Sequence, residues 1–206
     1  MKDIYRTIKN PSQGTLFKEK GSKFYGYAFP IVHEEEVKLH IAELKKLHPA
    51  AGHFCYAWQL GKDAIRFRVS DDGEPNNSAG MPIYGQIQAF DLTNILVVSV
   101  RFFGGTKLGV GGLIQAYKYS AQITLEGLEI IERTIDVHYQ LTFDYELMNS
   151  VRRIIKEKNI HIIHQDLGQA CVYRIAIRRQ EAEEIFQRFE GLYKVQIKKI
   201  AQQKTL

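Results

Sequence analysis

The residues best suited to chemistry lie in one stretch of the chain, residues 70–117. Its first part carries three carboxylates within four positions, Asp71, Asp72 and Glu74. Its later part carries five glycines around a single lysine, Lys107, and these are Gly104, Gly105, Gly109, Gly111 and Gly112. Ordinary folding does not require so many residues of these types in one place, so the stretch is the first place to expect a functional site.

The glycine-rich segment is suited to binding an anion, although it matches no standard phosphate motif. It is neither a Walker A loop, because Leu108 follows Lys107, nor a GxGxxG sequence. Glycines let backbone N–H groups turn toward a ligand, and Gly111 and Gly112 open a predicted helix whose N-terminus is partly positive. Lys107 and Arg101 would add full charges. The alternative is a loop that needs glycine only for positive φ angles and close packing.

The acidic segment allows two interpretations. Its carboxylates could hold Mg²⁺ against a phosphate. They could also cap the helix expected near Ser78, or pair with Arg101 and Lys107 and so pin the two loops together. The second interpretation is favoured, and the sequence predicts neither a metal nor a cofactor.

Two further groups of residues deserve chemical scrutiny. His53 and Cys55 share one face of a predicted strand, but neighbours two positions apart point side by side, so no nucleophile–base pair is expected. Arg101 with Phe102 and Phe103 combines hydrogen-bond donors with two aromatic rings, which suits phosphate binding or base stacking. Core packing and a salt bridge are the alternative.

The elements that position these residues follow from periodicity. The apolar run 95–100 predicts a strand buried on both faces, with the glycine-rich segment at its end. Alternation predicts strands at 23–31 and 53–60, and it places Ile65, Phe67 and Val69 on a core face. Helical spacing appears in residues 34–47, 81–90 and 114–125. The order predicts an α+β sandwich with its helices on one face.

The pattern restarts near residue 135 and gives a second domain. Alternating and helical segments follow in the order strand 137–143, helix 147–158, strands 160–163 and 171–177, helix 182–189 and strand 193–200. This is the ferredoxin-like order βαββαβ. The sequence therefore predicts two domains, residues 1–133 and 134–206, with residues 202–206 frayed. Solvated faces account for the basic pairs Arg152–Arg153, Arg178–Arg179 and Lys198–Lys199.

Composition sets broad limits on location and partners. The net charge of +5 permits contact with nucleic acid or an acidic partner, and it equally suits solubility. The two cysteines, Cys55 and Cys171, are too few and too far apart for a disulfide framework or a structural zinc site. No apolar signal core or run of about 20 apolar residues is present. A cytoplasmic protein without a membrane partner is predicted.

Several motifs together resemble the YigZ/IMPACT family over residues 5–132. They are DDGEP at 71–75, SAGMPI at 78–83, RFFGGTKLGVGGL at 101–113, AY at 116–117, GSKF at 21–24 and HFCYAW at 53–58. The chain departs from the family pattern at three places. It has Asn76, Asn77 and Ser78 where the family has Ser-Gly-Thr, Phe102 where it has Tyr, and Gln115 where it often has Arg.

The resemblance implies a fold and a field of activity. The first domain would be like the second domain of ribosomal protein S5, and the second like the C-terminal domain of translocating elongation factors. Eukaryotic IMPACT proteins regulate translation under stress by competing for a partner, without catalysis. Their extra N-terminal domain has no counterpart in these 206 residues, so that partner does not carry over.

The sequence thus predicts a non-enzymatic cytoplasmic factor, related to the regulation of translation, that binds RNA, the ribosome or a translation-associated protein. The predicted binding residues are Lys23, Phe24, His53, Asp71, Asp72, Glu74, Arg101, Phe103, Gly104, Gly105, Lys107, Gly109, Gly111 and Gly112. One alternative is an enzyme acting on a phosphorylated small molecule or nucleotide, with the same loops holding the phosphate. Another is a plain protein-binding module. No catalytic residue is predicted, and the oligomeric state is left open.

Overall fold

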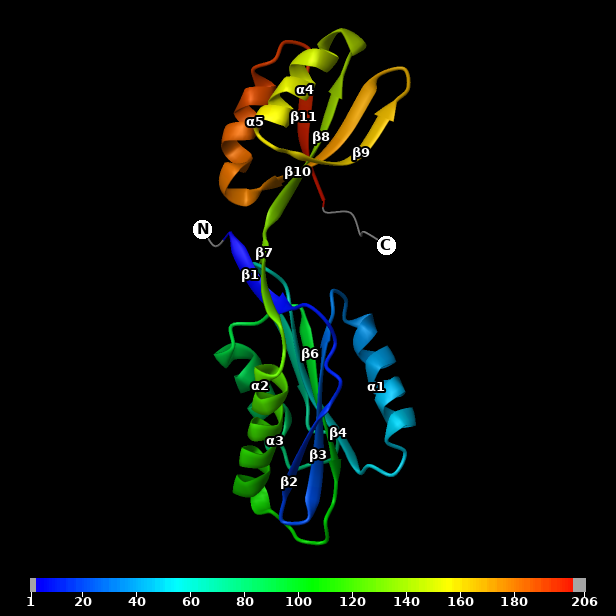
Figure 1. Ribbon diagram of the computed structural model, residues 1–206, viewed down its shortest axis with the longest axis vertical. Coiled ribbons are helices and arrows are strands. Elements are labelled where there is room, and N and C mark those ends of the chain that lie inside the picture. The colour runs from blue at the N-terminus through cyan, green and yellow to red at the C-terminus, as the bar shows by residue number, and fades with distance from the viewer. Residues whose placement is uncertain (1–2, 202–206) are drawn as a thin grey trace. The chain divides into compact units, whose positions relative to one another are not determined.

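The structure, a computed structural model, describes residues 3–201, and these separate into two compact units (Figure 1). The N-terminal unit comprises residues 5–133, and the C-terminal unit comprises residues 3–4 together with 134–201. Each unit combines antiparallel strands with helices, which confirms the predicted two-domain α+β class. The fraying expected of residues 202–206 concerns positions outside the described residues.

A five-stranded antiparallel sheet forms the centre of the N-terminal unit. Its strand order is β2-β3-β6-β4-β5. The bounds are β2 Thr15–Glu19, β3 Ser22–Pro30, β6 Ile95–Phe102, β4 His53–Leu60 and β5 Arg66–Ser70. The central strand β6 is buried at every position from 95 to 101, as its continuous apolar sequence predicted.

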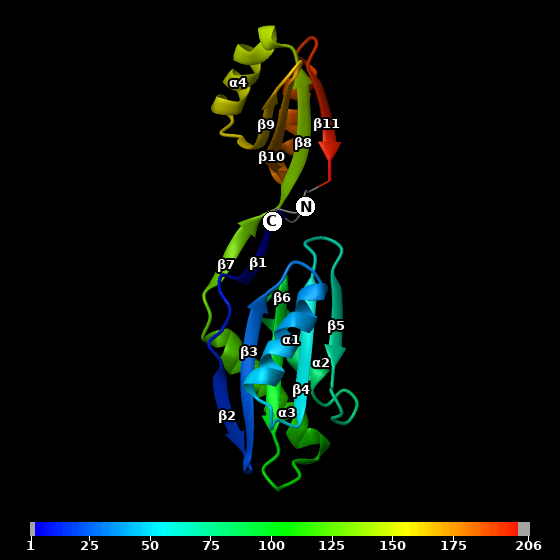
Figure 2. The ribbon, with the colours of Figure 1, turned by 90° about the vertical axis from the view of Figure 1, so that its right-hand side faces the viewer.

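Helices cover both faces of this sheet, so the prediction that they lie on one face is wrong (Figure 2). Helices α2 (Gly80–Ala89) and α3 (Gly109–Glu126) pack on one face, and α1 (Glu35–Leu47) packs on the other. The reason is that the inner strands are apolar on both sides. On β3, for example, Phe24 belongs to the core under α2 and α3, whereas Tyr27 belongs to the core under α1.

The edge strand β5 is a second difference. Ile65 and Phe67 were predicted in the core, but their exposures are 46% and 50%. Strand β5 is the last strand of its sheet and has a neighbour, β4, on one side. Phe67 still stacks on the Tyr84 ring of α2, with centroids 4.2 Å apart, so its ring is partly covered.

A small sheet of β1 (Ile4–Ile8) and β7 (Ile130–Thr134) adjoins the N-terminal unit. Lys9 N donates a hydrogen bond to Glu129 O at 3.1 Å, and Ile8 is buried in the core under α2 and α3. The sequence did not predict β7, because its second half is polar and exposed. The strand forms because it pairs with β1, which is distant in the sequence, and not because its own residues alternate.

The C-terminal unit has the predicted βαββαβ order. Its elements are β8 Asp136–Phe143, η1 Tyr145–Leu147, α4 Met148–Glu157, β9 His161–Leu167, β10 Cys171–Arg178, η2 Arg179–Glu181, α5 Ala182–Glu190 and β11 Gln196–Ile200. The strands form an antiparallel sheet in the order β11-β8-β10-β9. Among the described helices of both units, none has the length and apolarity needed to cross a membrane.

The first prediction concerns independent folding of the C-terminal unit. A fragment of residues 135–206 contains that unit's whole apolar core, so it should fold cooperatively and give dispersed amide signals in an NMR spectrum. The fragment lacks Asp3, which pairs with Arg178 in the full chain. Water can solvate Arg178 instead, because its side chain is 41% exposed. A random-coil spectrum would contradict the domain boundary.

Candidate functional site

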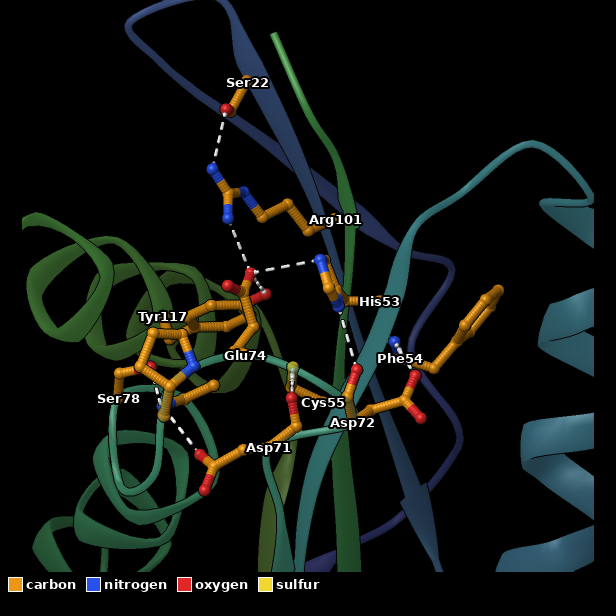
Figure 3. A network of polar contacts seen from close by, with 12 residues as sticks. Ser22, His53, Phe54, Cys55, Asp71, Asp72, Glu74, Ser78, Arg101 and Tyr117 are labelled. Carbon is orange, nitrogen blue, oxygen red and sulfur yellow. Dashed lines mark hydrogen bonds and ion pairs between the residues drawn. The ribbon is translucent and has the colours of Figure 1, made fainter. Parts of the chain in front are cut away.

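The carboxylate of Glu74 is the centre of a buried polar network (Figure 3). Its Oε1 accepts hydrogen bonds from Arg101 Nη1 at 2.6 Å and from Tyr117 Oη at 2.7 Å. Glu74 is 9% exposed, Arg101 4% and Tyr117 0%. This is a buried ion pair with an added hydroxyl donor, and it joins three segments: the loop after β5, the end of β6, and α3.

Strand register brings further predicted residues to the same place. Phe24 on β3 and His53 on β4 both lie directly opposite Arg101 on β6. Residues paired in this way project to the same face of a sheet. That face is the one covered by α2 and α3, and α3 contributes Tyr117. The sheet therefore gathers residues that are separated by up to 93 positions in the sequence.

Asp71 caps the N-terminus of α2, as the favoured interpretation of the acidic segment required. Its Oδ1 accepts from the backbone N–H groups of Ala79 at 3.0 Å and Gly80 at 2.8 Å, and its Oδ2 accepts from Asn77 N at 2.8 Å. A carboxylate there satisfies free N–H groups and complements the helix dipole. Asp71 therefore serves the loop's own structure.

Asp72 is also used internally. Its Oδ2 accepts a hydrogen bond from Phe54 N at 2.6 Å, which ties the acidic loop to β4. All three carboxylates of the segment thus have partners within the protein. Among the described residues, no group of three His, Cys, Asp or Glu side chains is arranged to hold a metal ion.

Among the side chains around Glu74, His53 is more exposed than Arg101 and Tyr117. Its Nδ1 lies 2.8 Å from the carbonyl oxygen of Asp72, which can only accept, so Nδ1 is the donor. This contact orients the ring, and Nε2 then points toward Glu74, 3.9 Å from Oε1. The His53 side chain is 28% exposed, so a ligand at the protein surface could reach it.

The thiol of Cys55 lies beneath this network and is not activated. Burial, first of all, raises the pKa of Cys55 well above its usual range, and the nearby carboxylates add to the effect. Its Sγ donates a hydrogen bond to the Asp71 carbonyl at 3.0 Å. Burial likewise raises the pKa of Tyr117 far above its ordinary value. A raised pKa keeps both groups protonated at neutral pH. Neither is then a nucleophile, because the reactive form of each is the deprotonated one.

Arg101 lies between two aromatic rings rather than on the surface. Its guanidinium carbon is 5.6 Å from the ring centroids of Phe24 and Phe103. Phe24 is fully buried, whereas Phe103 is 56% exposed. Arg101 therefore forms a salt bridge, which was the alternative to a surface role, and Phe103 provides an exposed aromatic ring. The hydroxyl of Ser22 accepts from Arg101 Nη2 at 3.3 Å and from Gly104 N at 3.2 Å.

We call residues 103–108 the glycine loop; it lies beside the β2–β3 hairpin at one end of the N-terminal unit (Figure 1). A Cβ at Gly104 would come within 1.9 Å of the Gly21 carbonyl carbon, so close approach requires glycine there. Gly105 and Gly109 have φ angles of 87° and 72°, which favour glycine.

Gly111 is different from the other glycines of this region. Gly112 has close contact with Leu108, since a Cβ there would lie 3.1 Å from the Leu108 Cβ. Gly111 has no positive φ, and a Cβ there would meet nothing within 4 Å. It lies exposed in the first turn of α3. Neither backbone geometry nor packing explains why this position is glycine.

A cluster of exposed lysines adjoins the glycine loop. Lys18, Lys20 and Lys23 lie on the β2–β3 hairpin, with Lys18 directly opposite Lys23, and Lys107 lies in the loop. We call these four residues the lysine cluster. None of them has an ion-pair partner among the described residues. The sequence singled out Lys23 and Lys107 but missed the other two.

The missed lysines had a detectable signal. They stand in the segment KEKGSK at 18–23, where Lys20 and Gly21 form the turn with φ angles of 45° and 82°. Two adjacent residues with positive φ are typical of a two-residue β-hairpin. Reading that turn correctly would have placed all three lysines at one hairpin tip.

The start of α3 completes the site. No described side chain caps this 18-residue helix, and its first turn contains no acidic residue. Its first N–H groups, at Gly109 to Gly112, therefore carry the partial positive charge of a helix N-terminus without a carboxylate to offset it. The arrangement of these N–H groups next to Lys107 suits an anionic group.

The second prediction tests the buried ion pair. Replacing Glu74 by Gln leaves the Arg101 charge buried without its partner, so it should lower the free energy of unfolding of the N-terminal unit by about 3–5 kcal/mol. Urea unfolding followed by fluorescence reports on this unit, because the single tryptophan, Trp58, is buried in it. Glu126→Gln, at an exposed position of α3, is the control and should change stability by less than about 0.5 kcal/mol. Equal effects of both substitutions would rule out the role given to Glu74.

Comparison with known proteins identifies relatives of this chain. Residues 20–125 match a family model described as the Impact N-terminal domain. A relative from Haemophilus influenzae named IMPACT family member is 34% identical over 172 residues, which cover 80% of this chain and 82% of that protein. Protein IMPACT of Mus musculus is 30% identical over 103 residues, or 48% of this chain and 32% of the mouse protein.

A solved structure extends the similarity to both units. A crystal structure of a hypothetical protein superposes with a TM-score of 0.72 and 25% identity, covering 98% of this chain and all of that one. The matched residues 20–125 contain the hairpin lysines Lys20 and Lys23, the acidic segment and the glycine loop. The chain belongs to the IMPACT family.

Proposed function

We propose that this protein is a non-enzymatic cytoplasmic factor that acts in the regulation of translation. Its family membership supports this role, since the resemblance described above links eukaryotic IMPACT proteins to translational control through competition for a partner. In this proposal the protein binds RNA, the ribosome or a translation-associated protein. The contact surface is the glycine loop, the lysine cluster and the first turn of α3.

Gly111 is the observation that carries the proposal. Glycine within a helix destabilises it by about 0.5–1 kcal/mol relative to alanine, and the fold gains nothing in return at this position. A residue without a side chain is useful where another molecule approaches the backbone closely. An approaching phosphate would meet the uncapped N–H groups of α3 and the charge of Lys107.

The lysine cluster favours RNA, including ribosomal RNA, among the three kinds of partner. Four exposed cations without ion-pair partners among the described residues suit the phosphates of a nucleic-acid backbone. Phe103 adds an exposed ring on which a base can stack. Together the lysines and Phe103 form a surface suited to contacting the RNA phosphates and stacking on an RNA base.

The predicted binding residues then divide into two roles. The exposed residues would contact the partner, and they are Lys23, Phe103, Gly104, Gly105, Lys107, Gly109 and Gly111. The buried or internally bonded residues would position that surface, and they are Phe24, Asp71, Asp72, Glu74 and Arg101. Gly112, packed against Leu108, belongs with the second group, and His53 lies between the two.

The third prediction uses salt dependence. If lysine–phosphate contacts drive binding, each lysine removed should lower the slope of log affinity against log salt by about 0.7–0.9. We expect this for Lys107→Ala and Lys23→Ala in fluorescence anisotropy with labelled ribosomal RNA fragments, and weaker co-sedimentation with ribosomes. Lys38→Ala, on an exposed position of α1, is the matched control and should leave the slope unchanged. Binding that is absent, or insensitive to salt, would contradict the RNA form of the proposal.

The fourth prediction separates a ligand role from a structural role at the glycines. Gly111→Ala should leave thermal stability unchanged or raise the free energy of unfolding by up to about 1 kcal/mol, yet weaken partner binding. Gly104→Ala should instead destabilise the unit, because its Cβ would overlap the Gly21 backbone.

The measurement is thermal unfolding of each variant with and without RNA, inorganic phosphate and nucleotides. Unchanged RNA binding by Gly111→Ala would remove the main support for a contact at α3. A rise in melting temperature with nucleotides but not with RNA would favour the alternative of an enzyme acting on a phosphorylated small molecule.

A further inference from the structure

Among residues 3–201, no helix packs on one face of the sheet of the C-terminal unit. Both α4 and α5 pack on the other face, where the inward residues of β8 and β10 form the core (Figures 1 and 2). These inward residues are Tyr139, Leu141, Phe143, Cys171, Tyr173, Ile175 and Ile177. The residues that alternate with them on β8 and β10 are all partly exposed, so we call their side the open face.

The strand register arranges the open face in rows that cross all four strands. One row consists of Lys198, Gln140, Arg174 and His164, in the order β11, β8, β10 and β9. The next row consists of Ile200, His138, Ala176 and His161. Strands lie about 4.8 Å apart, so each row is about 14 Å long.

These two rows contain hydrogen-bond donors and no carboxylate. Lys198 and Arg174 carry full positive charges, and Gln140 carries an amide. Acidic residues lie only beyond the two rows: Asp166 in the row on one side, and Asp136 opposite Arg178 on the other. Arg178 is itself paired with Asp3. The centre of the open face is therefore its cationic part.

We propose that the open face binds single-stranded RNA. In the RRM module, a four-stranded sheet stacks two or three unstacked bases on its face, and the rows have the length for this. The exposed imidazole rings of His161 and His164 offer planar groups on which bases stack. Lys198 supplies charge for the phosphates, and Gln140 can bond base edges.

The same features distinguish single-stranded RNA from other anionic partners. Planar side chains across a sheet contact unstacked bases, whereas a duplex keeps its bases stacked inside. An acidic peptide would use the charges of Lys198 and Arg174 but not the imidazole faces. The inference does not rest on the proposed function, because the open face and the glycine loop belong to different units.

Lys198 and Lys199 provide a matched pair for the test. They are adjacent on β11 and both exposed, but Lys198 is paired with Gln140 on the open face, whereas Lys199 is paired with the inward residue Tyr139. The full-length protein would be titrated into a fluorescent single-stranded RNA of about 12 nucleotides, a length within the usual site size. Lys198→Glu should weaken binding about tenfold or more, and Lys199→Glu less than about threefold.

A second variant covers the case in which Lys198→Glu disturbs the fold, which circular dichroism would show. His164 is exposed on the edge strand β9, so His164→Ala should keep the fold and still weaken binding by about threefold. Equal losses with Lys198→Glu and Lys199→Glu would overturn the inference, as would equal affinity for duplex RNA of the same length. Competition by polyglutamate as effective as that by unlabelled RNA would also overturn it, in favour of an acidic protein partner.

The two RNA surfaces can be told apart in the same assay. Full binding by Lys198→Glu together with loss of binding by Lys107→Ala would overturn the open-face inference and support the glycine loop as the contact. The reverse result would support the open face and count against the proposed function at the glycine loop. Losses in both variants would support both surfaces.

Discussion

The buried pair of Glu74 and Arg101 is the interaction on which the site depends. Removing two charges from water is costly, and their attraction offsets that cost only when the remaining hydrogen-bonding groups are also satisfied. Tyr117 supplies a second donor to Glu74, and Ser22 accepts from Arg101. Each of these residues comes from a different segment, so satisfying the pair fixes the acidic loop, β6, α3 and the hairpin relative to one another. The glycine loop begins where these four segments meet.

The acidic segment is largely committed to contacts within the protein. All three carboxylates of the segment accept hydrogen bonds within the protein, from helix N–H groups, a strand N–H group and a guanidinium, although only Glu74 is buried and Asp72 is exposed. On the hairpin and the glycine loop, the exposed positive charges are those of the lysine cluster. Along these two segments, the exposed charges without an ion-pair partner among the described residues are therefore cationic, although the sequence motif that marks the region is anionic.

The sequence was sufficient to predict features that depend on local pattern. The run 95–100 predicted the central strand, and alternation with helical spacing predicted the βαββαβ order of the C-terminal unit. Features that depend on pairing between distant segments of the chain were harder to predict. Phe67 has the pattern of a core residue, but its exposure depends on β5 being the last strand, which no local pattern reveals. The helix arrangement failed for the same reason, since α1 could cover either face of the sheet.

The candidate site shows the same division. The types and spacing of Asp71, Glu74 and the glycines identified the region, and the cap and ion-pair alternatives were foreseen. Burial of Arg101 was not, because it results from Phe24 and Tyr117 closing over it from elements far away in sequence. The sequence also could not distinguish Gly111 from the other glycines, because only the three-dimensional structure shows that a side chain there would meet no other atom.

The placement of the two cysteines has a consequence for measuring the stability of each unit. Cys55 is buried in the N-terminal unit and Cys171 in the C-terminal unit, and burial raises the pKa of both thiols. An alkylating reagent can reach either sulfur only when the surrounding structure opens. The chain thus carries one natural chemical reporter in each half. Rates of alkylation at the two positions, resolved by mass spectrometry of peptides, would give separate opening equilibria for the two halves within a single unmodified protein.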